Sequence, residues 1–319
     1  MNYRTEIAHQ FIQKQLSSRT DIVGVLLVGS VSRGEDTASS DIDLRFIVEG
    51  KAGETLDREN ADGWEQGVYI DATFASHEIY TDLEKILENP VRANDMNSGV
   101  IVYDATGLLM QLQTQTRREF MKPERITARV QPLVSRLEQE IIHLQEAMTN
   151  NDALRMCVWA GRVMFRLAVI PLMRRGIAPS STRHLIQLGA VDPALKASLF
   201  ELEGTTHMNE ADALQRFQIA ARLNSACDVS SWGQLTEYMI RKANWLAQNG
   251  CPREALHGMW NNNGFRANDC LKCSDPQTIA NAEAIAREWL QAMGWKGQAV
   301  LAAKMEMVKM IQQEIEPAA

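Results

Sequence analysis

The sequence predicts a protein of two domains: an N-terminal domain that combines helices with a β-sheet (α/β or α+β), and an all-α helical bundle behind it. Three observations predict this. The chain has 319 residues, enough to bury two cores. Short β-rich runs are confined to the first third, and after them apolar residues recur every three or four positions. We therefore expect domains at residues 1–122 and 123–319, meeting near Lys122 and Pro123.

The N-terminal domain is expected to begin with an amphipathic helix at residues 1–16. A second helix, opened by Ser76, is expected at residues 76–89, between the third and fourth strands. The strands themselves are short runs rich in β-branched and other apolar residues. They are predicted at residues 22–29, 42–48, 67–74 and 99–104.

The C-terminal domain is predicted from helical periodicity alone. Apolar residues from Ile126 to Met148 recur at helical spacing, and a second helix follows Asp152 and ends near Gly176. The stretch at residues 251–273 reads as irregular. Further helices are predicted at residues 193–203, 208–225, 231–249, 277–293 and 297–315.

Composition restricts the class of protein. Apolar residues make up 45% of the chain and charged residues 23%, which is typical of a soluble globular protein. The net charge of -7 opposes sequence-independent attraction to nucleic acid, so no nucleic-acid partner is expected. We expect neither a signal peptide nor an apolar run long enough to cross a bilayer, hence no membrane and a cytoplasmic location. The five cysteines do not form a disulfide framework.

The most informative stretch is "LLVGSVSRGEDTASSDIDLRFIV", residues 26–48. Asp41 and Asp43 are two positions apart, so on a strand they point to the same side. Two neighbouring carboxylates repel each other unless a cation lies between them. Mg²⁺ prefers oxygen ligands and usually combines one or two carboxylates with substrate phosphates. The pair therefore predicts a site for a metal and a nucleotide.

The turn after the first strand has the groups that phosphates need. Gly29 lets backbone N–H groups approach closely, and Ser30 and Ser32 add hydroxyl groups. Arg33 adds a charged donor. We expect these four residues to bind the nucleotide.

Asp71 is a third acid, inside the apolar run "VYIDATF". Burying a carboxylate there without partners is costly, which favours a metal ligand. Three acids can hold two Mg²⁺ ions, with Asp41 and Asp43 bridging both. Asp71 would hold the first ion and could accept the proton of an attacking hydroxyl, although the sequence leaves open which residue is the base.

These residues resemble the DNA polymerase β-type nucleotidyltransferase superfamily, whose signature is an apolar strand, Gly-Ser, about ten residues, Asp-x-Asp and a later acid. The form "GSVSRG" followed by "SDIDL" is similar to the branch with bacterial antibiotic (aminoglycoside and lincosamide) adenylyltransferases and minimal nucleotidyltransferases. The resemblance covers residues 20–105. It implies a mixed sheet flanked by helices, an NTP with Mg²⁺, and transfer of a nucleoside monophosphate to a hydroxyl.

We therefore interpret the chain as a Mg²⁺-dependent nucleotidyltransferase that moves AMP from ATP, or the equivalent from another NTP, to a small hydroxylated acceptor and releases pyrophosphate. An aminoglycoside-like antibiotic is one candidate acceptor. Two alternatives stay open. The acceptor could be a protein, as for antitoxin-type nucleotidyltransferases, or the chain could be a non-catalytic nucleotide-binding module. The three acids together disfavour the last.

Three weaker patterns each have an ordinary structural explanation. "SSTRHL", at residues 180–185, loosely resembles a Ser-plus-basic turn in the helical domain of antibiotic nucleotidyltransferases, which would make Arg183 a phosphate donor; helix capping explains its serines equally well. One helix face carries Arg155, Trp159, Arg162 and Arg166 without neighbouring acids on the same stripe. This face is either an anion-binding wall or a solvated face with one packed Trp. Zn²⁺ could be bound by Cys251, His257, Cys270 and Cys273, or these could be ordinary side chains.

Overall fold

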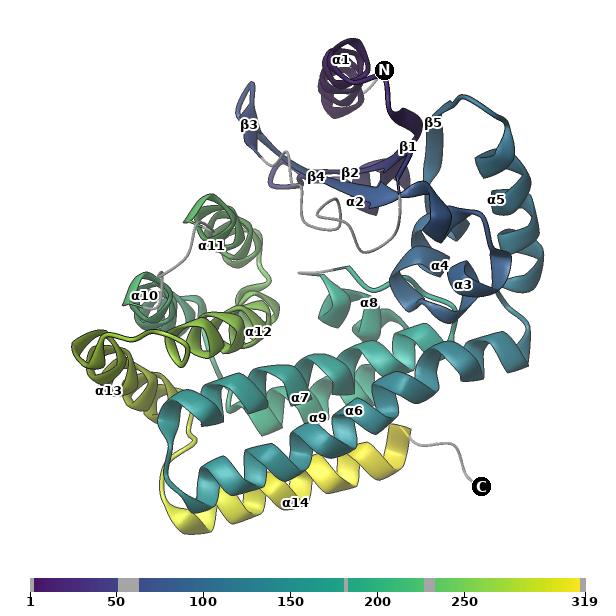
Figure 1. Ribbon diagram of the computed structural model, residues 1–319. Helices are drawn as coiled ribbons and strands as arrows, with labels where there is room; N and C mark the ends of the chain where they lie inside the picture. Colours follow the sequence, from purple (N-terminus) through teal and green to yellow (C-terminus); the bar gives the residue numbers. More distant parts are fainter. Residues whose placement is uncertain (1–2, 51–62, 181–182, 227–232, 316–319) are drawn as a thin grey trace. The chain divides into compact units, whose positions relative to one another are not determined.

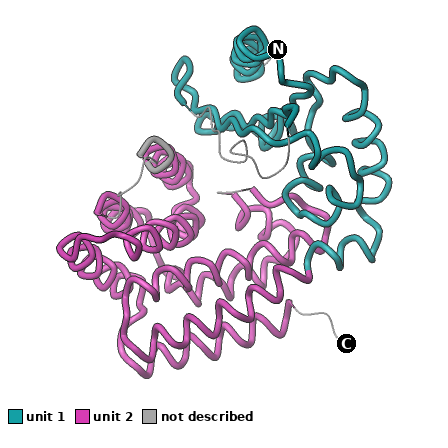
Figure 2. The backbone as a smooth tube through the Cα atoms, in the orientation of Figure 1, with its two compact units in different colours: residues 1–130 teal, residues 131–319 magenta. Residues whose placement is uncertain are grey.

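The structure, a computed structural model, describes residues 3–50, 63–180, 183–226 and 233–315. The chain forms two compact units, residues 1–130 and residues 131–319 (Figure 2). Helix α6, Pro123–Thr149, contributes to both units, because it begins in the first and continues into the second. The domain boundary expected at 122/123 stays a prediction, and each unit is described below by itself.

Unit 1 is built around a five-stranded sheet in the order β3-β4-β2-β1-β5. β2 and β4 pair in parallel, and the other neighbouring pairs are antiparallel, so the mixed sheet that the sequence motif implied is confirmed. The elements in chain order (Figure 1) are α1 Tyr3–Ser18, β1 Ile22–Val28, α2 Gly29–Ser32, β2 Ile42–Val48, β3 Gly63–Glu65, β4 Val68–Ser76, the 3₁₀-helix η2 His77–Tyr80, α3 Leu83–Glu88, α4 Pro90–Ser98, β5 Val100–Asp104 and α5 Leu108–Glu119.

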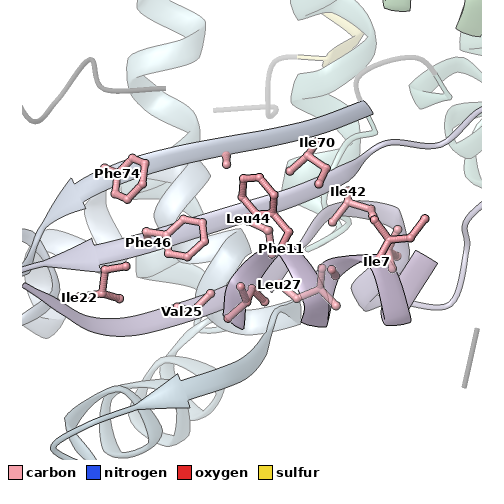
Figure 3. Close-up of a cluster of buried hydrophobic side chains, with 14 of the residues drawn as sticks. Ile7, Phe11, Ile22, Val25, Leu27, Ile42, Leu44, Phe46, Ile70 and Phe74 are labelled. Atoms are coloured by element: carbon pink, nitrogen blue, oxygen red, sulfur yellow. The ribbon is translucent and has the colours of Figure 1, made fainter. Parts of the chain in front are cut away.

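The two faces of this sheet carry separate apolar clusters, as alternating side chains require. On one face Ile7 and Phe11 of α1 pack against Leu44, Phe46 and other strand residues (Figure 3). On the other face Ile47 and residues of β1 pack against η2, α3, α4 and α5. β2 is therefore apolar toward α1 at every second position, and the intervening positions Asp43 and Arg45 lie on the face of Ile47.

Unit 2 is all helical in the part of the chain that the structure describes, as the sequence predicted. α7 and α12 lie in its centre: most of their residues are buried, and the two helices pack directly on each other. After α6 the helices are α7 Ala153–Arg174, α8 His184–Val191, α9 Pro193–Glu203, α10 Glu210–Ala226, α11 Gly233–Gln248, α12 Pro252–Cys270, α13 Pro276–Ala292 and α14 Gln298–Ile315.

The irregular conformation expected for residues 251–273 is wrong, because most of that stretch is α12. The reason is that α12 packs against α7, α10 and α11, so it is buried on several sides and lacks a single apolar stripe. The helix expected at residues 76–89 is instead η2 followed by the short α3, and α4 begins anew at Pro90. The sequence also did not predict α5 and the short strand β3.

One helix in the described part of the chain, α7, is long and apolar enough to span a membrane by length and composition, although Arg162 and Arg166 interrupt its apolar run. Of its most apolar window, 78% is buried inside the protein. That burial is typical of a core helix, since a membrane span would present its apolar residues to lipid.

Candidate active site

The site begins with two carboxylates on neighbouring parallel strands. Asp43 of β2 is the register partner of Asp71 of β4. Neighbouring strands lie about 4.8 Å apart, and partners in register point to the same face, so both carboxylates lie together on the face opposite α1. Both side chains are partly buried. Asp41 directly precedes β2 and is buried, 7% exposed. The sequence analysis predicted all three acids as metal ligands, and the structure shows that Asp43 and Asp71 are neighbours in the sheet.

The turn after β1 is shaped around Asp43. Gly29 has a φ of +71°, and a Cβ on it would lie 1.9 Å from Oδ2 of Asp43. No side chain fits there, so the glycine lets the backbone of α2 approach the carboxylate. This close approach connects the predicted phosphate-binding turn to the predicted metal-binding acid.

The polar residues of the turn already have partners. The Ser32 hydroxyl donates to the Gly29 carbonyl at 2.9 Å, which stabilises the turn. The Ser30 carbonyl accepts from the Glu35 amide at 2.9 Å. Arg33 forms an ion pair with Glu35, Nε to Oε2 at 3.0 Å. Binding a phosphate through Arg33 would therefore compete with Glu35, which is half exposed.

The loop before Asp41 is held by α1. Arg4 donates from Nε to the Ser40 carbonyl at 3.0 Å and from Nη2 to the Ala38 carbonyl at 2.7 Å. Arg4 also pairs with Asp36 at 3.5 Å. The position of Asp41 therefore depends on a residue far away in the sequence. The sequence analysis did not identify Arg4, and no local pattern marks it.

Arg45 is a second residue that the sequence analysis missed. It lies on the same face of β2 as Asp43, with its guanidinium between Asp71 (Nη1 to Oδ1, 3.7 Å) and Asp95 of α4 (Nε to Oδ2, 3.4 Å). Burial lowers the pKa of Arg45, but the carboxylates of Asp95, Asp71 and Asp43 outweigh it, and the net shift is upward. Burial raises the pKa of Asp95 to about 6, despite the opposing effect of Arg45.

The donor set fits a divalent ion that arrives with its own ligands. Among the residues that the structure describes, no three His, Cys, Asp or Glu side chains are gathered as a cage for a metal. Asp43 and Asp71 nevertheless place carboxylate oxygens side by side, and Asp41 is adjacent in the chain. This set suits Mg²⁺, which usually takes one or two carboxylates and completes its shell with water and phosphate oxygens.

Arg183 lies in unit 2, at the start of α8. Its backbone N–H donates to the Ser180 hydroxyl at 3.3 Å, and the Ser180 carbonyl hydrogen-bonds with Nδ1 of His184 at 2.9 Å. These contacts stabilise the turn before α8, but the N-cap of α8 is Arg183, without a side-chain capping hydrogen bond, so the capping explanation is wrong for Ser180. A role of Arg183 in binding nucleotide stays a prediction.

The arginine face of α7 does have acidic partners, so the expectation that it lacked nearby acids is wrong. Arg166 forms a two-point ion pair with Glu140 of α6, at 2.5 and 2.8 Å. Arg155 pairs with Asp152 at 3.4 Å. Arg162 lies over the Trp159 ring, 4.9 Å from its centroid. These contacts favour a structural face over an anion-binding wall.

The zinc hypothesis is wrong for the arrangement that the structure describes. Cys251 precedes α12 and Cys270 ends it, so the two thiols are separated by a helix of 19 residues, about 28 Å at 1.5 Å per residue. His257 is turned to Glu203 instead. The sequence spacing was misleading because the stretch between the cysteines is extended along a helix axis and does not fold back.

A family model matches part of unit 1. Residues 10–102, which run from α1 into β5, match the nucleotidyltransferase domain family of the polymerase β-like superfamily. The resemblance to a nucleotidyltransferase domain is thereby confirmed for these residues of unit 1, whereas the resemblance to the branch with antibiotic adenylyltransferases stays a prediction.

The comparison with solved structures includes a nucleotidyltransferase-like protein from Exiguobacterium sibiricum 255-15. It is 12% identical, and the match covers 90% of each chain with a TM-score of 0.38. That score is too low for the likeness to support an argument about substrate. No curated protein matches the chain.

Proposed function

We propose that unit 1 transfers a nucleoside monophosphate from an NTP to a hydroxyl of a small-molecule acceptor, with ATP as the expected donor and Mg²⁺ as the expected metal. The observation that carries this proposal is the register of Asp43 with Asp71 beside the Gly29 turn. Two carboxylates on one face of the sheet, with a close backbone approach beside Asp43, suit a metal-bound triphosphate.

In the proposed reaction the acceptor oxygen forms a bond to the α-phosphorus while the bond from that phosphorus to the pyrophosphate oxygen breaks. Pyrophosphate leaves with the electron pair of that bond, and the hydroxyl proton passes to the carboxylate of Asp71. Gly29, Ser30, Ser32 and Arg33 hold the phosphates through backbone N–H groups, hydroxyls and the guanidinium. Positioning and charge neutralisation supply most of the acceleration.

Asp41, Asp43 and Asp71 would hold the metal. Bound divalent ions would neutralise charge on the phosphates and stabilise the leaving pyrophosphate. The close approach of the Gly29 backbone to Oδ2 of Asp43 supports this role for Asp43. The loop that Arg4 holds sets the position of Asp41 at the start of β2.

The test is calorimetric titration of a non-hydrolysable ATP analogue with Mg²⁺ into the wild type, Asp43→Asn and Asp71→Asn. Asp21→Asn is the matched control, since Asp21 precedes β1 at the end away from Gly29 and is paired with Arg19. Metal-dependent binding should be lost in the two site variants and kept in the control. Equal binding in all four proteins would refute the proposal.

The acceptor is identified by pyrophosphate release. We expect release with ATP and small hydroxylated compounds, aminoglycosides among them, and none with ATP alone. Release only in the presence of a protein fraction would favour the protein-acceptor alternative. Nucleotide binding without release under any of these conditions would favour a non-catalytic module. GTP, CTP and UTP in place of ATP define the base preference.

A further inference from the structure

Arg45 is an unusual residue to find beside a metal-binding carboxylate pair. Asp43, Arg45 and Ile47 lie on the same face of β2. Ile47 is apolar and packs in the core with α3–α5, so Arg45 lies between this core and Asp43. The Arg45 side chain is 19% exposed, Asp71 is 33% exposed and Asp95 is 15% exposed. The Arg45 guanidinium therefore lies between the more exposed carboxylate of Asp71 and the more buried carboxylate of Asp95.

The contacts of Arg45 fix its position. Nε faces Asp95 at 3.4 Å, Nη1 donates to the Leu44 carbonyl at 3.2 Å, and Nη1 is 3.7 Å from Oδ1 of Asp71. Two of these partners, Asp95 and the Leu44 carbonyl, belong to the folded frame and not to the predicted metal ligands. Arg45 is thus held by α4 and β2, and presents a fixed positive charge to Asp71.

A fixed cation next to a metal-binding carboxylate has two consequences. It restrains the Asp71 carboxylate by charge attraction, because Nη1 of Arg45 lies 3.7 Å from Oδ1 of Asp71. It also repels a divalent ion, and this repulsion is offset when an anionic triphosphate binds beside it. Metal affinity then depends on whether the nucleotide is present, and by linkage nucleotide affinity depends equally on the metal.

We propose that Arg45 is a positioning residue that orients Asp71 and makes divalent-metal binding depend on the nucleotide triphosphate. This inference rests on the proposed function of the site, and it adds a role for a residue outside the Asp-x-Asp motif. Asp95 has a supporting role, since it holds the guanidinium from the side of α4.

The experiment measures Mn²⁺ binding by the loss of the free-ion electron paramagnetic resonance signal, without nucleotide and with a non-hydrolysable ATP analogue. The proteins are the wild type, Arg45→Met, Arg45→Lys and Arg19→Met. Arg19 is a matched control in unit 1: it is paired with Asp21, its side chain is 24% exposed, and it lies over the Phe74 ring at the far end of the sheet.

Without nucleotide, Arg45→Met should bind Mn²⁺ about tenfold more tightly than the wild type, which is the effect of one unit charge about 6 Å from a divalent ion at the dielectric constant of water. Arg45→Lys keeps the charge and should bind Mn²⁺ like the wild type, and Arg19→Met should too. With the nucleotide analogue bound, the difference between Arg45→Met and the wild type should shrink. Equal Mn²⁺ affinity of Arg45→Met and Arg19→Met would overturn the inference.

If Arg45→Met does not fold, because Asp95 is left buried without its partner, the double variant Arg45→Met/Asp95→Asn removes both charges and keeps the volume. The double variant should bind Mn²⁺ more tightly than Asp95→Asn alone, because the two proteins differ only in the Arg45 charge, and equal affinity of the two would overturn the inference. Loss of metal–nucleotide binding in Asp43→Asn and Asp71→Asn tests the proposed function separately. If those two variants behave as expected and the Arg45 variants match Arg19→Met, only the role of Arg45 fails. If the wild type binds no metal–nucleotide complex, both proposals fall.

Discussion

At the scale of single residues, Gly29 is the most constrained position of the site. Alanine there would have a φ of +71° and a Cβ 1.9 Å from Oδ2 of Asp43. We expect Gly29→Ala to lower the free energy of unfolding by about 3 kcal/mol, the combined cost of left-handed backbone and overpacking. Because Asp43 must move, binding of the ATP analogue with Mg²⁺ should also be lost. Urea denaturation and calorimetry measure the two effects.

Gly34 is the matched control for Gly29. It also has a positive φ, +67°, but a Cβ on it would meet nothing within 4 Å. Gly34→Ala should therefore cost only the backbone term, about 1 kcal/mol, and leave nucleotide binding intact. Equal loss of binding in the two variants would show that backbone strain in the turn, and not contact with Asp43, is what matters.

At the scale of elements, the packing of α7 on α12 depends on glycines. A Cβ on Gly161 would lie 2.4 Å from the Trp260 carbonyl oxygen, whereas a Cβ on Gly258 would meet nothing within 4 Å. Gly258 is buried and lines a small apolar cavity between α11 and α12. We expect Gly258→Ala to raise the free energy of unfolding by about 0.5–1 kcal/mol, and Gly161→Ala to lower it by about 1–3 kcal/mol.

Chemical denaturation of these two variants tests whether the helices approach as closely as described. The substitutions are chemically identical and both lie inside helices, so intrinsic helix propensity cancels in the comparison. A similar gain in stability from both would contradict direct backbone contact of α7 with α12.

A buried acid–base pair joins α9 to α12. Glu203 and His257 are almost completely buried and hydrogen-bonded to each other. Burial raises the pKa of Glu203, and burial lowers the pKa of His257 to about 3. Both shifts favour neutral forms, so the folded pair holds one proton, on the carboxyl group that donates to Nδ1. This explains how Oε2 of Glu203 can lie without a hydrogen-bond partner among the described residues, since a neutral carbonyl is cheaper to bury than a charged one.

This pair predicts a stability maximum between about pH 4.5 and 6.5, the ordinary pKa values of Glu and His. Below that window the unfolded pair binds two protons and the folded pair one, so stability falls as pH falls. Above it the unfolded pair binds none and the folded pair keeps one, so stability falls as pH rises, by up to about 1.4 kcal/mol per pH unit. The free energy of unfolding should be measured from pH 4 to 8 for the wild type and for Glu203→Leu/His257→Leu. The difference between the two proteins should show this maximum. A flat difference would contradict it.

At the scale of the whole molecule, the start of α6 is tied to unit 1. Arg125 forms a two-point ion pair with Glu84 of α3, at 2.5 and 2.7 Å. Arg129 is 2% exposed, donates to the Phe120 carbonyl and lies over the Phe120 ring. Unit 1 accordingly extends to residue 130.

A fragment of residues 1–130 should therefore unfold at a higher temperature than one of residues 1–122. The shorter fragment lacks Arg129, which leaves the buried Phe120 without its cover, and we expect a difference of about 2 kcal/mol or more from the lost packing. Circular dichroism during heating measures it. Equal melting temperatures would place the boundary at residue 122, as the sequence predicted.

The features that could be predicted from the sequence are those that depend on the spacing of residues close together in the chain. Period-2 and period-3.6 apolar spacing identified four strands of unit 1 and most helices of unit 2. The glycine-serine turn and the spacing of Asp41 and Asp43 predicted a candidate site, because a strand places alternate residues on one side. Patterns of this kind need only neighbouring residues, so no tertiary structure is required to read them.

Only the tertiary structure shows the contacts between residues that are far apart in the chain. It set Asp71 in register with Asp43 and brought Asp95 of α4 to Arg45, across about fifty residues of chain. It also showed that α12 is a helix. The sequence of α12 lacks a helical apolar periodicity because the helix is packed against α7, α10 and α11. The physical reason is the same in each case: these residues are stabilised by burial against partners that no local spacing specifies, and a buried charge such as Arg45 is interpretable only once those partners are known.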